Sequence, residues 1–228
     1  METIVSKIAI MLVPALLAII LHEVAHGYIA ERFGDPTARL LGRLTMNPFK
    51  HLDPIGTIAI FIFGFGWARP VPVNPGNFRR PRRDMIWVAL AGPATNLLLA
   101  ALSALLLRGF GMLDQSSIGD SSIYAQFITP VKMMVGFSLY INVLLGVFNL
   151  IPVPPLDGGR ILAGILPERQ AALLSKLESF GFVLILFLVF FTDVWSLVLG
   201  PIINTLVIFL AGDEARLVEQ SIRFLFGH

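Results

Sequence analysis

The 228-residue sequence contains no cysteine and few charged residues. Without cysteine there is no disulfide framework and no thiolate metal site, so only His, Asp and Glu remain as ligands for a zinc ion. Charged residues make up 14% of the chain and hydrophobic residues 56%. This balance lies well outside that of an ordinary soluble domain, and it predicts an all-α membrane protein that crosses the bilayer several times.

Histidine is also scarce, with four in the chain: His22, His26, His51 and His228. This number excludes the membrane di-iron oxygenases, which need many histidine ligands. The first apolar segment is too long for a cleaved signal peptide and ends in a polar cluster, which excludes that reading. A formal net charge of +2 gives no reason to expect a nucleic-acid partner.

The polar cluster is His22-Glu23-Val24-Ala25-His26. Ionisable side chains at the end of a membrane-length apolar run are costly to bury and indicate a functional site. Histidines four residues apart lie on one face of a helix, so His22 and His26 can bind the same metal ion. Glu23 can then hold and deprotonate a water molecule on that metal. The short pattern H-E-x-x-H also occurs by chance, but chance would leave these polar side chains without partners in the membrane.

The long apolar runs predict about five transmembrane helices. The final run, 180–210, is longer than one span needs; Thr192-Asp193 and Gly200-Pro201 favour two short spans, and one long kinked helix is the alternative. The tail, 213–228, is expected to be an amphipathic surface helix. Three further spans are predicted, at about 4–30, 85–107 and 127–150.

Residues 37–83 are rich in proline, glycine and basic side chains, so they do not form a simple membrane helix. Within them, 55–67 is apolar but too short to cross a bilayer, and basic residues flank it. We expect a re-entrant or interfacial segment there. We expect short strands at 38–46 and 68–73, which either receive an unwound substrate by strand addition or cap the cytoplasmic side.

Basic residues also predict the orientation in the membrane. Residues 37–83 and 160–176 are rich in Lys and Arg, whereas 108–126 has a single basic residue, Arg108. By the positive-inside rule the first two segments are cytoplasmic. This places the histidine cluster in the cytoplasmic half of the first span. The expected location is the plasma (inner) membrane, with the active site toward the cytoplasm.

A catalytic zinc ion typically has three protein ligands and one water ligand. Asp157 is the strongest candidate for the third protein ligand, because it follows a span and lies in a proline-rich segment that cannot continue the helix. Gly158 and Gly159 permit a close approach of the backbone at this point. Two alternatives stay open: Asp157 could be the N-cap of the next helix, and His51 could be the third ligand.

Several motifs, in this order on apolar segments, resemble the site-2 protease family of intramembrane zinc metalloproteases, in its compact branch without a PDZ or CBS domain. The likeness covers roughly the first three quarters of the chain. The motifs are His22-Glu23-Val24-Ala25-His26, Gly42-Arg43-Leu44-Thr45-Met46-Asn47-Pro48, Trp67-Ala68-Arg69-Pro70-Val71-Pro72-Val73-Asn74, Gly92-Pro93-Ala94-Thr95-Asn96, Asn149-Leu150-Ile151-Pro152 and Leu156-Asp157-Gly158-Gly159-Arg160.

This resemblance implies that His22, His26 and Asp157 bind one Zn²⁺ per chain and that Glu23 is the general base. It also implies that Asn149 binds the substrate backbone or stabilises the oxyanion. The expected substrates are transmembrane proteins in the lipid bilayer, cut within or near their membrane segments. Such cleavage serves regulated intramembrane proteolysis or the clearance of membrane peptides.

The main alternative is a non-catalytic membrane scaffold or transporter that uses buried polar residues structurally. For Asn96 and Asn142, a role as interhelical hydrogen-bond partners is as consistent with the sequence as a functional one. A second alternative is a membrane zinc enzyme that hydrolyses something other than a peptide. We expect one integral-membrane domain, 1–228, with a catalytic core at about 4–166 and C-terminal spans and tail at about 180–228. The sequence does not indicate the natural substrate or the oligomeric state.

Overall fold

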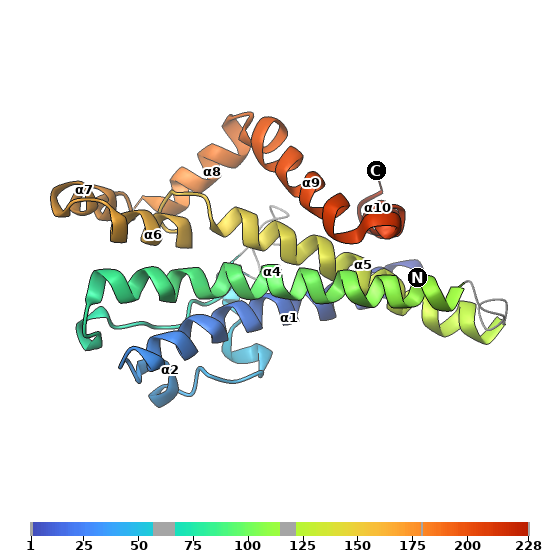
Figure 1. Cartoon of the computed structure of the whole chain (residues 1–228), viewed down its shortest axis with the longest axis horizontal. Coiled ribbons are helices and arrows are strands. Elements are labelled where there is room, and N and C mark those ends of the chain that lie inside the picture. The colour runs from blue at the N-terminus through green and yellow to red at the C-terminus, as the bar shows by residue number, and fades with distance from the viewer. Residues whose placement is uncertain (1, 57–66, 115–121, 179, 228) are drawn as a thin grey trace. The chain divides into compact units, whose positions relative to one another are not determined.

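The structure is a computed structural model that describes residues 2–56, 67–114, 122–178 and 180–227. These residues are mostly helical, as predicted (Figure 1). The α-helices are α1 (Glu2–Arg32), α2 (Thr37–Leu40), α4 (Pro81–Asp114), α5 (Ser122–Asn149), α6 (Asp157–Ile165), α7 (Glu168–Glu178), α8 (Gly181–Phe191), α9 (Gly200–Ala211) and α10 (Ala215–Phe226). Short turns of other helix types lie at η1 (Pro48–Lys50), η2 (Pro75–Asn77), η3 (Trp195–Leu199) and η4 (Gly212–Glu214).

Four helical segments of the described chain are long and apolar enough to cross a membrane, compared with the five or so expected. The first three agree with the predicted spans: the first extends two residues further at its C-terminal end, the second extends at both ends, and the third differs by one residue at each end. The four segments are Ile4–Arg32, Pro81–Leu113, Gln126–Asn149 and Trp195–Phe226.

The last apolar block is interrupted, as its polar and proline residues predict. Helix α8 ends at Phe191, and Thr192 has an extended backbone. A π-helical turn, η3, follows and leads into α9, which has Pro201 in its first turn. With 11 residues, α8 is only about 16 Å long, which is too short to cross the hydrocarbon core alone. The predicted tail helix is present as α10.

The chain divides into two compact units. The first contains 1–18, 96–147 and 193–228, so it includes parts of α1, α4 and α5. Buried amides join these three helices, since Asn96 Nδ2 donates to Asn142 Oδ1 at 2.8 Å and to the Ala18 carbonyl at 3.2 Å. About two turns further along α4, the Ser103 hydroxyl hydrogen-bonds to Ser138 of α5 at 2.9 Å. These contacts support the interhelical hydrogen-bonding role for Asn96 and Asn142.

Helix α10 packs on α5 within the same unit. Gly136 leaves room for this contact, because a Cβ added there would lie 2.8 Å from Ser221 Oγ. The rings of Phe137 and Phe226 are 6.4 Å apart. Lys7 of α1 places its ammonium 5.5 Å from the centre of the Phe224 ring. The tail helix is therefore amphipathic, as predicted, but one of its faces is covered by protein.

The second unit contains 19–95 and 148–192. Here the C-terminal half of α1 packs closely against the segment that follows it (blue in Figure 1). A Cβ added at Gly27 would lie 2.6 Å from the Leu44 side chain and 3.0 Å from Val71. The strand expected at 38–46 is wrong, because the structure has helix α2 and a turn at Gly42, whose φ is +63°. Positive φ favours glycine, so this residue ends the short helix.

The strand expected at 68–73 is an extended segment without a β-ladder. Within the described residues it makes one antiparallel bridge, between Leu52 and Ala68, and the Arg69 N–H donates to the His51 carbonyl at 2.8 Å. Pro70 and Pro72 cannot donate to a ladder, which explains why the pairing stops. The re-entrant segment expected at 55–67 lies largely outside the described residues.

Asp35 joins the end of α1 to the loop before α4. It is fully buried, and its carboxylate accepts hydrogen bonds from the Asn74 N–H and the Asn77 side chain, both at 2.7 Å. The Thr37 hydroxyl and N–H donate to the same carboxylate. Burial alone would raise the pKa of Asp35, but these hydrogen bonds together hold the pKa below its usual value. The carboxylate therefore stays charged and fixes the loop beside α1.

Candidate metal centre

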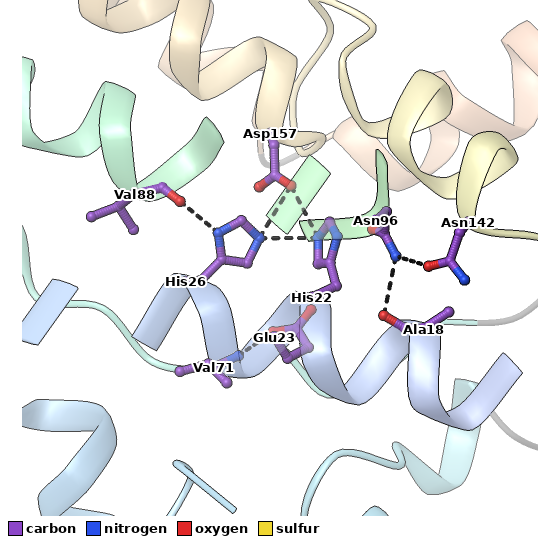
Figure 2. Close-up of polar contacts among 9 residues, drawn as sticks. All are labelled: Ala18, His22, Glu23, His26, Val71, Val88, Asn96, Asn142 and Asp157. Atoms are coloured by element: carbon purple, nitrogen blue, oxygen red, sulfur yellow. Dashed lines mark hydrogen bonds and ion pairs between the residues drawn. The ribbon is translucent and has the colours of Figure 1, made fainter. Parts of the chain in front are cut away.

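Three predicted ligand residues come together in the second unit. His22 and His26 lie one turn apart on α1, and their Nε2 atoms are 3.0 Å apart. Asp157, the first residue of α6, places Oδ2 at 3.1 Å from His22 Nε2 and 3.2 Å from His26 Nε2 (Figure 2). All three residues are buried, with 6–7% of their surface exposed. They form the group of side chains in the described residues that could hold a metal ion.

The separations between the three ligand atoms fit a tetrahedral site. With zinc–ligand bonds of about 2.0 Å, two ligands of a tetrahedron lie about 3.3 Å apart. The observed separations of 3.0, 3.1 and 3.2 Å are close to this value. Three protein ligands leave the fourth position of the tetrahedron for water or substrate, as in catalytic zinc sites.

The hydrogen-bonding pattern also fits a cation. His26 contacts the Val88 carbonyl through Nδ1 at 2.7 Å. A carbonyl can only accept, so Nδ1 carries the proton and Nε2 presents its lone pair to the centre of the site. Asp157 Oδ2 is buried and has no hydrogen-bond partner among the described residues. A carboxylate oxygen and a ring lone pair that face each other repel unless a cation lies between them.

Gly92 gives the two histidine rings the space they occupy. A Cβ added to this residue of α4 would lie 2.4 Å from His26 Nε2 and 2.6 Å from His22 Nε2. The sequence motif contained Gly92, but nothing in the sequence places it against the ligand atoms. Glycine is therefore needed here for close approach, and the helix keeps it in its interior despite its low helix propensity.

We expect Gly92→Ala to weaken zinc binding by about 10–100-fold, the range found when groups that orient metal ligands are changed. The added methyl group would push both rings away from the positions in which they converge with Asp157. Zinc affinity of the purified protein, measured by competition with a chelator, tests this. Gly109→Ala on the same helix is the control, because a Cβ there meets nothing within 4 Å. Equal zinc affinity in the two variants would contradict the role of Gly92.

The segment between α5 and α6 aims Asp157 at the histidines. Glycine is required after it, because a Cβ at Gly158 would lie 2.3 Å from the carbonyl oxygens of Leu150 and Ile151. The alternative that Asp157 is an N-cap is wrong. The N-cap of α6 is Leu156, without a side-chain hydrogen bond, and Asp157 is the first helical residue.

Glu23 lies on α1 beside His22 and is partly buried. Its carboxylate accepts a hydrogen bond from the backbone N–H of Val71 at 2.7 Å (Figure 2). The partner comes from the extended segment after Arg69, 48 residues along the chain. Sequence reasoning could not find this contact, because a backbone donor has no side-chain signature.

The remaining candidates from the sequence are His51 and Asn149. His51 is buried, and its Nε2 contacts the Thr45 carbonyl at 2.8 Å; it does not belong to the group of converging ligand atoms in the described residues. Asn149 is the last residue of α5. The two residues after it contact the Gly158 position, which brings this end of α5 next to the start of α6.

The sequence is similar to those of known proteins. Residues 9–192 match the model of peptidase family M50. YwhC of Bacillus subtilis (strain 168), named as a zinc metalloprotease, is 41% identical over 199 residues, which are 87% of this chain and 88% of that protein. Rip2 of Mycolicibacterium smegmatis, also named as a zinc metalloprotease, is 33% identical over 179 residues, or 76% of this chain and 63% of that protein.

A more distant relative is the zinc metalloprotease MJ0392 of Methanocaldococcus jannaschii. It is 26% identical over 218 residues, which are 95% of this chain and 52% of that protein. No solved structure gives a significant match. The names of these relatives and the His, His, Asp group agree on zinc as the metal.

Proposed function

The chain belongs to peptidase family M50, and we propose that it is an intramembrane zinc metalloprotease that hydrolyses peptide bonds within or near transmembrane segments of membrane proteins. The observation that carries this proposal is the position of the ligand group. His22 and His26 lie inside the helical segment Ile4–Arg32, which is long and apolar enough to cross a membrane. A protease centre in such a helix meets substrates that are themselves in the membrane.

In this proposal His22, His26 and Asp157 are the three protein ligands of one zinc ion. When bound, zinc lowers the pKa of a coordinated water from about 15.7 toward about 7 and polarises the scissile carbonyl. The three side chains are buried, so they offer their ligand atoms in a low-dielectric environment where the charge of Asp157 favours a cation. Gly92 and the Val88 carbonyl keep the two rings in place.

Glu23 is the proposed general base. Its neighbour His22 is a ligand, so its carboxylate can take a proton at the reaction centre and later give it to the leaving amine. The Val71 N–H holds one carboxylate oxygen, Oε2, and leaves the other for the proton. A backbone donor orients the carboxylate without removing its charge.

Asn149 is the proposed donor to the developing oxyanion. We expect Asn149→Ala to retain zinc and thermal stability in detergent but to reduce turnover about 10²–10³-fold, the loss typical of an oxyanion donor. Single-turnover cleavage of a transmembrane substrate and a melting curve of the same preparation test this. If the variant melts markedly earlier while its folded fraction cleaves at the normal rate, Asn149 is a packing residue and the oxyanion has another donor.

The proposed orientation places the metal centre toward the cytoplasmic side of the plasma membrane. The support comes from charge, since the segments that continue α1 and precede α4 are rich in arginine. Fusion of a reporter to the C-terminus and labelling of single cysteines in 37–54 and 108–114 test this topology. The absence of native cysteine makes such labelling specific.

The function itself is tested in cells. The membrane proteome of cells that carry the Glu23→Gln variant is compared with that of the wild type. Accumulation of membrane proteins or peptides that the wild type cuts within or near a transmembrane helix supports the proposal. If the only proteins that accumulate are soluble, the intramembrane substrate class is wrong.

A further inference from the structure

A basic cavity lies near the end of α1 and the start of α4, on residues that the metal centre does not use. It has a volume of about 500 Å³ and is lined by residues 31–34, by the two residues that precede α4, and by residues of the first turns of α4. Four arginines line it: Arg32, Arg79, Arg80 and Arg83. The cavity and its lining belong to the second compact unit.

The carboxylates of this cavity do not pair with the side chains of Arg79, Arg80 or Arg83, whereas Arg32 lies near Glu31 and donates to the Tyr28 hydroxyl at 2.5 Å. Glu31 forms an ion pair with Arg39, which lies outside the cavity lining. Asp84 accepts a hydrogen bond from the backbone N–H of Arg80 at 2.9 Å, so it satisfies the start of α4. Among the described residues, none forms a hydrogen bond or ion pair with the side chains of Arg79, Arg80 and Arg83.

Arg82 serves as an internal comparison. It lies in the same basic run, but its guanidinium donates to the carbonyls of Gly164 and Leu166 at the end of α6. That contact gives Arg82 a structural role, since a cation favours the C-terminal end of a helix. The other arginines of the run have no such role.

Arginine is unfavourable at the start of a helix, because the N-terminal end carries a partial positive charge. Like charges that line one cavity beside this end of a helix favour repulsion, and Arg79, Arg80 and Arg83 line it as exposed residues. An anion in the cavity would remove this repulsion and would satisfy several guanidinium donors at once. Phosphate has the geometry for this, because a guanidinium can donate two parallel hydrogen bonds to its oxygens.

The position of the cavity indicates the source of the phosphate. Two candidate membrane spans, Ile4–Arg32 and Pro81–Leu113, have their ends at this cavity. Trp87 also lines it and is 53% exposed on α4. Tryptophan and arginine together at the ends of spans are typical of the headgroup layer. We propose that this cavity binds the phosphate of an anionic phospholipid headgroup.

The test uses the full-length, zinc-loaded protein in detergent and native mass spectrometry. The protein is titrated with dioleoylphosphatidylglycerol, with dioleoylphosphatidylcholine and with inorganic phosphate. We expect phosphatidylglycerol to bind more tightly than the other two. In the double variant Arg79→Gln/Arg83→Gln its affinity is expected to fall about 30-fold, since each basic residue near an anionic lipid contributes a factor of about five.

The matched control is Arg169→Gln/Lys176→Gln on α7, which removes the same charge from exposed positions outside the cavity. It is expected to change the affinity less than about twofold. An equal loss of phosphatidylglycerol affinity in both double variants would show that the lipid responds to the overall surface charge and not to this cavity, and it would overturn the proposal. Equal affinity for inorganic phosphate and phosphatidylglycerol would assign the cavity to a soluble anion instead. If the double variant loses its zinc or melts early, the affinity for phosphatidylglycerol is measured on the single variants Arg79→Gln and Arg83→Gln instead. Each is expected to bind this lipid about fivefold more weakly, and an unchanged affinity in both would overturn the proposal.

Discussion

Replacing Glu23 with Gln is expected to reduce the rate of peptide hydrolysis about 10²–10⁴-fold, the loss typical of a missing general base. Glutamine has nearly the same shape and can still accept the hydrogen bond from the Val71 N–H. The amide cannot take up a proton, so the chemical step fails while the fold and the zinc site persist. Cleavage of a transmembrane substrate by purified protein, with zinc content measured on the same sample, provides the test.

Glu219→Gln is the control for this experiment. Glu219 lies on α10, is exposed, and pairs with Arg223 one turn away. The Glu219→Gln replacement also removes one negative charge, but at a position far along the chain from His22, His26 and Asp157. We expect it to leave turnover unchanged. Near-normal cleavage by Glu23→Gln would rule out Glu23 as the base.

Removal of Asp157 has the second large expected effect. The Asp157→Ala variant should fall from about one zinc per chain to a small fraction, because two histidines alone do not complete a site that needs three protein ligands. Hydrolysis should be lost together with the metal. Elemental analysis of the purified variant after dialysis against a weak chelator measures the loss.

His51→Ala separates this prediction from the alternative third ligand. His51 contacts the Thr45 carbonyl and does not converge with the two histidines of α1 in the described chain. We therefore expect His51→Ala to keep its zinc, even where the loss of a buried ring lowers thermal stability. If Asp157→Ala kept full zinc and His51→Ala lost it, the ligand assignment would be wrong.

The sequence predicts which three side chains converge in the structure, because their signals are local or scarce. The spacing of His22 and His26 is fixed by the helix, and helix formation follows from a long apolar run. Asp157 is 131 positions beyond His26 in the chain, so no periodicity connects them. It could be identified because few carboxylates follow a span and the prolines before it end the helix. The resemblance to the family pointed to the same three residues.

The parts that the sequence did not predict depend on contacts between distant backbones. The role of Gly92 follows from the two imidazole rings that lie against its Cα. The Val71 donor is a backbone group, and such groups are alike in every residue except proline. The strand expected at 38–46 failed because Gly42 and Pro36 favour a short helix followed by a turn. The described residues contain four candidate spans rather than about five, because α8 is too short to cross the membrane alone.

The extended segment at 69–72, whose Val71 N–H binds Glu23, has no free backbone N–H donor. The Arg69 N–H is used by the His51 carbonyl and the Val71 N–H by Glu23, while Pro70 and Pro72 have none. An added strand therefore finds no free N–H donor from position 69 to 72, and the Arg69 carbonyl already accepts a hydrogen bond from the Arg43 guanidinium at 2.8 Å. Proteins protect exposed edges against indiscriminate pairing in this way. We therefore expect the side chains of a substrate, rather than strand addition at 69–72, to determine which chains this protein accepts.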